Sequence, residues 1–175
     1  MFAGCTALDR AISSMDSRNS ASPPAQTTIP KAPATAKPPV VSMREAMSDE
    51  LGSSNRDQGS RPSQWSTNGR QIVVTWPIND NLTDGMIKDG ARLDTFKILK
   101  TIRNHPDWQK RKYVDVVVRG TYSMQNTYGE VREAEVIEAF FSRATINRIQ
   151  FDNISFKDIF DLADPLSVTI HPEFQ

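Results

Sequence analysis

The chain is poor in residues that build covalent or metal-bound frameworks, and its charges cancel. A single cysteine in 175 residues rules out a disulfide within the chain. The 21 basic side chains match 21 acidic ones, whereas a general nucleic-acid or acidic-lipid binder has a basic domain. No apolar run approaches the ~18 to 20 residues that a membrane-spanning helix needs. We therefore expect no nucleic-acid partner, and the length indicates one domain with a tail.

Common motifs of enzymes and cofactor-binding proteins are also missing. The sequence contains no Gly-x-Gly-x-x-Gly or Walker loop, no Gly-x-Ser-x-Gly elbow and no paired cysteines for zinc. Its only imidazoles, His105 and His171, each precede a proline at the predicted end of an element, where hydrogen bonds to the backbone are a more common role than catalysis. We therefore expect a non-enzymatic protein with no cofactor, no metal, no catalytic residue and no small-molecule substrate.

A segment after the first predicted strand matches an EF-hand calcium loop in part. Three positions match, among them Asp80 and Asp84, but Leu82 replaces an oxygen ligand and Ala91 replaces the bidentate glutamate. These two departures exclude a regular EF-hand site. We expect a turn followed by a helix cap, and a weaker site that includes Asp80, Asp84 and Asp89 is the alternative.

The lone cysteine stands in a distinctive position near the N-terminus. Phe2-Ala3-Gly4-Cys5 places it directly after a bulky apolar residue and two small ones. This order resembles a bacterial lipobox, in which the cysteine thiol receives a diacylglycerol and anchors the protein to the membrane. The resemblance implies that Cys5 is lipidated and that the protein lies at the cell membrane or cell surface, held by acyl chains whose buried CH2 groups each add ~0.8 kcal/mol. A cytoplasmic protein with a disordered N-terminal tail is the alternative.

A long polar segment follows this anchor region. Residues 13–64 are dominated by Ser, Pro, Ala, Thr, Asn and Gly, and prolines are dense in 22–39. Proline removes backbone donors, and with little apolar surface to bury, the entropy of ordering is not offset. We predict a disordered linker, and a transient helix in the short amphipathic patch at 41–47 is the alternative for that part. The predicted organisation is an anchor region at 1–12, a linker at 13–64 and a folded domain at 65–175.

Three dense patterns predict the frame of that domain. Residues 70–78 contain a β-branched and aromatic run that ends at Pro77, which is typical of a strand. Residues 86–104 carry apolar side chains at helical spacing over a broad arc, and His105-Pro106 ends this helix. Residues 113–124 form the strongest strand pattern in the chain. The broad apolar arc indicates a helix that lies across a sheet.

The segment 130–141 is ambiguous between strand and helix. It is rich in helix formers, yet a strand here would pair with 113–124 across the loop 125–129 and satisfy the backbone groups of that strand. We therefore predict an antiparallel hairpin. Three shorter elements are expected after it: a helix capped by Ser142 and running to Ile149, a helix capped by Ser155 and running to Asp161, and a strand at 168–170. The predicted fold class is α+β, with one main helix packed on a small, mostly antiparallel sheet.

One basic cluster lies between the predicted main helix and the strongest strand. Within residues 103–113, the basic side chains of Lys110, Arg111 and Lys112 stand beside the aromatic Trp108. Such a mixture can bind phosphate groups or polyanionic cell-wall polymers. These four residues form a candidate patch for an anionic ligand, and a solvated connection between two elements is the alternative.

Four glutamates in the predicted hairpin form an acidic counterpart: Glu130, Glu133, Glu135 and Glu138. In a regular strand, Glu133 and Glu135 share one face and Glu138 lies on the other. Paired carboxylates occur in glycosidases, but no sugar-stacking aromatics surround these. A charged edge that resists the addition of another strand is the favoured role.

Together these patterns predict a membrane-anchored surface lipoprotein that presents a small, non-enzymatic binding domain. Its partner would be a protein or a cell-wall component, reached while a lipid holds the chain at the membrane. A small cytoplasmic enzyme or adaptor with a disordered N-terminal tail is the alternative.

Overall fold

The computed structural model describes residues 41–175, so Cys5 and the predicted anchor region at 1–12 lie outside the described residues. The helices are α1 (Met43–Leu51), α2 (Asp84–Asn104), α3 (Pro106–Gln109) and α4 (Arg143–Arg148), with short 3-10 helices η1 (Phe156–Asp158) and η2 (Pro172–Phe174). The strands are β1 (Gln64–Asn68), β2 (Gln71–Pro77), β3 (Asp115–Gln125), β4 (Val131–Ser142) and β5 (Val168–Ile170).

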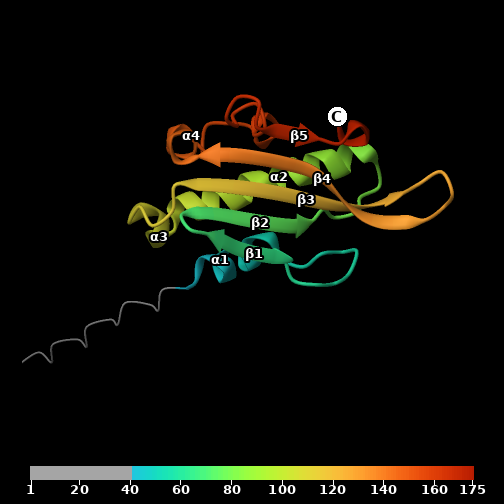
Figure 1. Cartoon of the computed structure of the whole chain (residues 1–175), viewed down its shortest axis with the longest axis horizontal. Helices are drawn as coiled ribbons and strands as arrows, with labels where there is room; N and C mark the ends of the chain where they lie inside the picture. Colours follow the sequence, from blue (N-terminus) through green and yellow to red (C-terminus); the bar gives the residue numbers. More distant parts are fainter. Residues whose placement is uncertain (1–40) are drawn as a thin grey trace, which may run out of the picture. The chain divides into compact units, whose positions relative to one another are not determined.

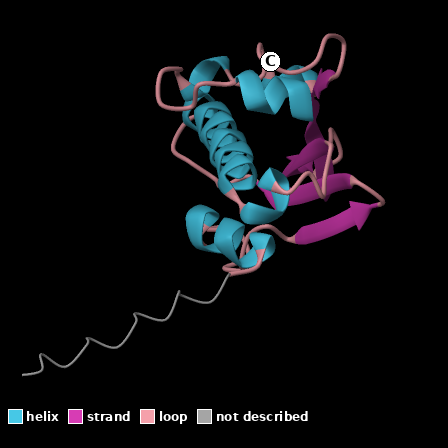
Figure 2. Ribbon diagram, turned by 90° about the vertical axis from the view of Figure 1, so that its left-hand side faces the viewer, coloured by secondary structure: helices cyan, strands magenta, loops and turns pink. Residues whose placement is uncertain are grey.

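The five strands form one sheet in the order β1-β2-β3-β4-β5 (Figure 1). β2 and β3 run parallel, and the other neighbouring pairs are antiparallel. Parallel neighbours need a crossover connection, and α2 carries the chain from the end of β2 back to the start of β3. Figure 2 shows α2 packed along one face of the sheet. The predicted α+β class, with a main helix on a mostly antiparallel sheet, is confirmed.

The main helix α2 begins after a capping residue and ends before a proline. The Thr83 side chain accepts a hydrogen bond from the N–H of Met86 at 3.3 Å and caps the helix. The helix ends at Asn104, before His105-Pro106, as predicted. Its apolar side chains in the same core as β2, β3 and β4 are Ile87, Ala91, Ile98, Leu99 and Ile102. Asp94 and Thr95 of this helix are also buried.

The pairing of β3 with β4 confirms the strand prediction for 130–141. β3 lies between β2 and β4, so β4 satisfies backbone groups that would be unpaired if this segment were a helix. Differences in helix propensity are below ~1 kcal/mol for ordinary residues, and pairing along an 11-residue strand outweighs them. Farther along the chain, Ser142 caps α4 and β5 lies at the predicted position, whereas η1 is shorter than the helix expected from 155 to 161.

A β-bulge in β4 changes the face on which one glutamate lies. Val136 is an extra residue in β4, between two positions that pair with consecutive residues of β3. Glu133 and Glu135 share a face as predicted, but the extra residue brings Glu138 to that face as well. Arg119 accordingly lies 2.8 Å from Glu138 and 3.6 Å from Glu135. The prediction that Glu138 lies on the opposite face was wrong, because the period of two is broken at the bulge.

The folded part of the chain begins before the predicted boundary at Trp65. Ser42 and Glu45 form a capping box at the start of α1, with hydrogen bonds of 2.9 Å and 3.2 Å between each backbone N–H and the other side chain. Three side chains of α1 are buried in the domain core: Met43, Met47 and Leu51. The prediction of a linker to residue 64 was wrong, because an apolar stripe with a spacing of four residues lies within an otherwise polar composition.

A buried ion pair attaches the segment between α1 and β1 to the main helix. Arg61 Nη1 lies 2.6 Å from Asp94 Oδ2, and Arg61 Nη2 donates a hydrogen bond to the carbonyl oxygen of Leu51. Burial raises the pKa of Asp94, although the charge of Arg61 acts in the opposite direction. Loss of one partner would leave an uncompensated buried charge, so this pair ties the end of α1 to α2.

We expect Met47→Ala to lower the free energy of unfolding by about 2–4 kcal/mol, because it removes a large buried side chain. Met47 is 0% exposed. Met86→Ala is the matched control, because Met86 is 49% exposed on α2 and its truncation should cost less than about 0.5 kcal/mol. Urea unfolding followed by circular dichroism measures both. Equal midpoints for the two variants would show that α1 does not pack on the domain.

Candidate functional site

A depression at the end of the sheet where β3 begins concentrates arginine side chains. It has a volume of about 620 Å³ and is lined by residues of α3 and α4, among others. These two helices lie toward the left in Figure 1. Its lining residues are Arg70, Gln109, Arg111, Val114, Arg143, Ala144 and Asn147. Three of these side chains are cationic and none is acidic. We call this depression the arginine pocket.

Backbone carbonyl groups hold two of the three guanidinium groups in place. Arg143 donates hydrogen bonds from Nη1 to the carbonyl oxygen of Tyr113 (2.9 Å) and from Nη2 to that of Trp108 (2.6 Å). Arg70 donates from Nη2 to the carbonyl oxygen of Arg111 (3.0 Å). In the part of the chain that the structure describes, no carboxylate forms an ion pair with any of the three arginines.

The three cations affect one another electrostatically. Burial lowers the pKa of Arg143, and the positive charges of Arg111 and Arg70 lower it further. Guanidinium groups nevertheless stay protonated at neutral pH, because their ordinary pKa is above ~12. An anion in the pocket would relieve this repulsion and accept charge-assisted hydrogen bonds from planar groups that suit phosphate and carboxylate oxygens.

The sheet register explains why arginines that are distant in sequence converge here. The first residue of β2 and the last residue of β4 both lie opposite Asp115, the first residue of β3. Arg70 directly precedes β2 and Arg143 directly follows β4, so both extend from the same end of the sheet. Arg111 lies in the turn between α3 and β3, in the left-handed region with φ of 59°, and its carbonyl group faces Arg70.

Trp108 does not belong to a ligand-binding patch, and this part of the prediction was wrong. Its side chain is 0% exposed, because the short helix α3 turns it into the core. Its Nε1 donates a hydrogen bond to Asn147 Oδ1 at 3.1 Å, and the Arg143 guanidinium lies 4.6 Å from the centre of its ring. The indole therefore packs against the Arg143 guanidinium, and an external ligand cannot stack on it.

The predicted basic patch is divided by the fold. Arg111 lines the arginine pocket, whereas Lys110 and Lys112 do not. Lys112 lies 3.3 Å from the Asp107 carboxylate and 5.4 Å from the centre of the Tyr113 ring. The side chain of Tyr113 raises the pKa of Lys112, and Asp107 acts in the same direction. The prediction named one of the three arginines and missed the two that flank the strands.

The two histidines make the backbone hydrogen bonds that we expected from their positions before proline. His105 Nδ1 accepts from the N–H of Asp107 at 3.2 Å, and its Nε2 lies 3.0 Å from the carbonyl oxygen of Val41. His171 Nδ1 accepts from the N–H of Glu173 at 3.4 Å. Both side chains therefore cap short helices.

The alternative calcium site is not assembled in the described structure. Lys157 lies 3.0 Å from Asp89, and Arg92 lies 3.2 Å from it; hydrogen bonding to Lys157, with a smaller effect of Arg92, lowers the pKa of Asp89. Within residues 41–175, no three His, Cys, Asp or Glu side chains are grouped so that they could hold a metal ion. None of the helices in this range is both long and apolar enough to cross a bilayer.

No family model, curated protein or solved structure matches this chain. The geometry and charge of the arginine pocket therefore carry the functional interpretation.

Asn147→Ala should lower the free energy of unfolding by about 1–2 kcal/mol, because it leaves the buried indole N–H of Trp108 without its acceptor. Asn153→Ala is a matched control at an exposed position, where we expect a change below about 0.5 kcal/mol. Urea titration with tryptophan fluorescence detection measures both variants. The same stability for both would mean that the bond to Asn147 does not hold Trp108.

Proposed function

We propose that the folded domain is a non-enzymatic module that binds an anionic polymer in the arginine pocket, and that a lipid on Cys5 holds it at the cell membrane. The observation that carries the first part is the convergence of three arginines on one depression. A guanidinium group has five N–H donors, and the backbone carbonyls take two from Arg143 and one from Arg70. Donors remain for an anionic ligand.

The shape and charge of the pocket favour a polymer of phosphate or carboxylate groups. Three cations exceed the charge of a single carboxylate, and several anionic groups along one chain would match them. The whole chain is neutral, so attraction must be local to this surface. Single-stranded nucleic acid binds to aromatic side chains on which its bases stack, and Trp108 is buried here. These features support an anionic polymer without bases.

Support for the membrane anchor comes from the sequence. The lipobox-like residues Phe2-Ala3-Gly4-Cys5 precede a segment rich in proline and serine. A lipid on Cys5 followed by such a segment would let the binding domain act at a distance from the bilayer. The alternative is a small cytoplasmic enzyme or adaptor with a disordered N-terminal tail.

Replacing Arg70 and Arg111 together with glutamine should weaken binding of short-chain inorganic polyphosphate by at least about tenfold, because each loses charge-assisted hydrogen bonds worth about 1.5–3 kcal/mol. The slope of log affinity against log salt should also fall by about one for each cation removed. Isothermal titration at several salt concentrations measures both quantities. Arg143 is left intact because it holds two backbone carbonyl groups.

The matched control is Lys110→Gln with Lys112→Gln, which removes the same charge just outside the arginine pocket. We expect its affinity for polyphosphate to stay within about threefold of the unaltered protein, since neither lysine lines the depression. An equal loss in both double variants would show that binding follows diffuse charge and not the pocket. A lack of polyphosphate binding at low salt would refute the proposal.

Cys5→Ala should abolish fatty-acid labelling when the gene is expressed in bacteria with its upstream sequence, because the thiol is the only acceptor of a diacylglycerol thioether in the chain. Metabolic labelling with a radioactive fatty acid, followed by separation of membrane and soluble fractions, measures the effect. Equal labelling of both proteins, or no label on either, would refute the proposal that Cys5 carries a lipid. It would not affect the proposal that the arginine pocket binds an anion.

A further inference from the structure

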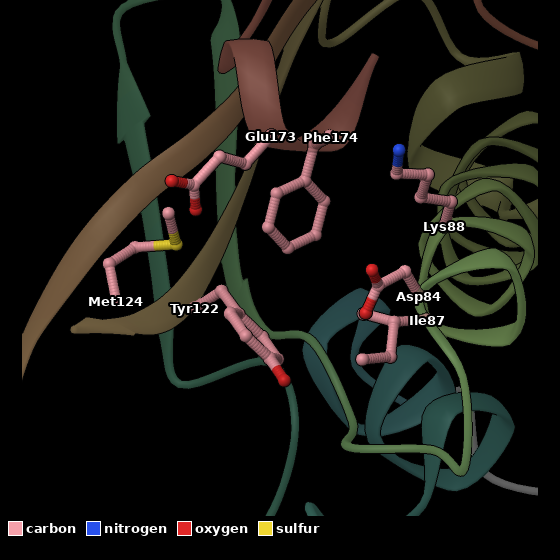
Figure 3. A pocket seen from close by; sticks show the side chains of 7 residues that line it. All are labelled: Asp84, Ile87, Lys88, Tyr122, Met124, Glu173 and Phe174. Carbon is pink, nitrogen blue, oxygen red and sulfur yellow. The ribbon is translucent and has the colours of Figure 1, made fainter.

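A second cavity lies at the other end of α2, between the first turns of that helix, the second half of β3 and the C-terminal segment (Figure 3). Its volume is about 370 Å³, within the range of ~300–1,000 Å³ that is usual for small-molecule sites. Its lining residues are Asp84, Ile87, Lys88, Tyr122, Met124, Glu173 and Phe174. We call it the aromatic pocket.

One part of the aromatic pocket is hydrophobic. Phe174 is 7% exposed and Ile87 is 8% exposed. The rings of Phe174 and Tyr122 meet edge to face, with their centres 5.2 Å apart and an interplanar angle of 67°. Met124 extends this surface along β3, and Figure 3 shows the Phe174 ring between the side chains of β3 and those of α2. A hydrophobic group of a ligand would find contacts on this surface.

The wall that carries Phe174 is attached to the sheet and to the main helix. The N–H of His171 donates a hydrogen bond to the carbonyl oxygen of Val136, the bulged residue of β4, at 2.8 Å. Lys88 Nζ, on α2, donates to a main-chain oxygen of Gln175 at 2.6 Å. The wall is therefore held from two sides, and the ammonium group of Lys88 already has an acceptor.

The charges of the lining favour a cation. The lining contains two carboxylates, those of Asp84 and Glu173, and one ammonium group, that of Lys88. Among the ion pairs of residues 41–175, neither carboxylate has a partner. A carboxylate accepts strong hydrogen bonds from an ammonium group. The Arg56 guanidinium already lies 5.2 Å from the centre of the Tyr122 ring, so a ligand cation is expected at the carboxylates. Carboxylates beside aromatic rings are thus complementary to an organic cation.

The hydroxyl group of Tyr122 lies near both acidic and basic side chains. Burial raises the pKa of Tyr122 to about 12, and the carboxylates of Asp80 and Asp84 act in the same direction against the opposing charge of Arg56. The phenol is therefore neutral at physiological pH. In Figure 3 the Asp84 carboxylate and the Tyr122 hydroxyl group lie below the Phe174 ring, whereas the Glu173 carboxylate lies beside Met124.

We infer that the aromatic pocket binds a small primary ammonium compound that carries a hydrophobic group. The ammonium group lies at the Asp84 carboxylate, and the hydrophobic group packs on Phe174 and Met124. This site takes a cation at one end of α2, whereas the arginine pocket takes an anion at the other end. The inference therefore does not depend on the function proposed for the arginine pocket.

Three probes of similar size and different charge test this inference: phenethylammonium, 2-phenylethanol and 3-phenylpropionate. Isothermal titration of the full chain at neutral pH should show the ammonium compound binding at least about tenfold more tightly than the alcohol, and the carboxylate not binding. Amide shifts of Ile87 and Phe174 in NMR spectra should change on addition of the ammonium compound. This series needs no variant and is independent of any effect of mutation on folding.

Asp84→Asn adds a second arm to the test. It should weaken binding of phenethylammonium at least about tenfold and leave binding of the neutral alcohol within about twofold, because only the charge of the lining changes. Glu130→Gln, in the hairpin loop, and the double Arg70→Gln, Arg111→Gln variant should bind phenethylammonium as the unaltered chain does. Unfolding midpoints of all variants are measured in parallel.

Several outcomes would overturn the inference. Equal affinity for the alcohol and the ammonium compound would mean that the pocket selects only hydrophobic groups. Tighter binding of 3-phenylpropionate would mean that Lys88 dominates the charge of the site. A lack of heat and of shift changes at millimolar phenethylammonium would mean that the cavity binds no such ligand.

Discussion

The parallel pairing of β2 with β3 is the constraint on which the rest of the domain depends. Antiparallel neighbours can be joined by a tight turn, but parallel neighbours require the chain to return along the sheet. α2 makes this return over 21 residues, a length of about 30 Å at ~1.5 Å per residue, and it buries one side in the core. Because the helix spans the sheet, the segments at its two ends lie at opposite ends of the strands. The aromatic pocket lies at the N-terminal end of α2, and the arginine pocket lies beyond its C-terminal end.

The parts of the fold that could be predicted from the sequence are those with dense local patterns. β2, α2 and β3 each contain apolar residues at the spacing of a strand or a helix, and β4 could be predicted because the strand at 113–124 needs a partner. α1 was missed since Met43, Met47 and Leu51 are few among polar neighbours, and their spacing of four residues was the available signal. The side of Glu138 was missed because nothing in the local pattern marks Val136 as an extra residue.

The arginine pocket shows what a linear pattern cannot report. Arg70, Arg111 and Arg143 share no local segment of sequence, and their convergence follows only from the register in which β2, β3 and β4 pair. Trp108 was assigned to the surface because it stands among basic residues, but α3 turns it inward. The chain is neutral as a whole, but its charges are unevenly distributed in space. The arginine pocket has three cationic side chains, and the aromatic pocket has two carboxylates and one ammonium group. Composition reports the sum of the charges, and the fold decides where they lie.

The bulge at Val136 has a consequence for how a binding surface can change in evolution. Its carbonyl group receives the N–H of His171 and so positions the wall that carries Phe174 through the main chain. Most substitutions do not remove a hydrogen bond between two main-chain groups. The exposed side chains of that wall can therefore change while the position of its backbone is kept. The shape of the cavity and its ligand selectivity thus depend on different groups. The backbone of β4 supports the cavity, and the side chains of the C-terminal segment determine which ligands it accepts.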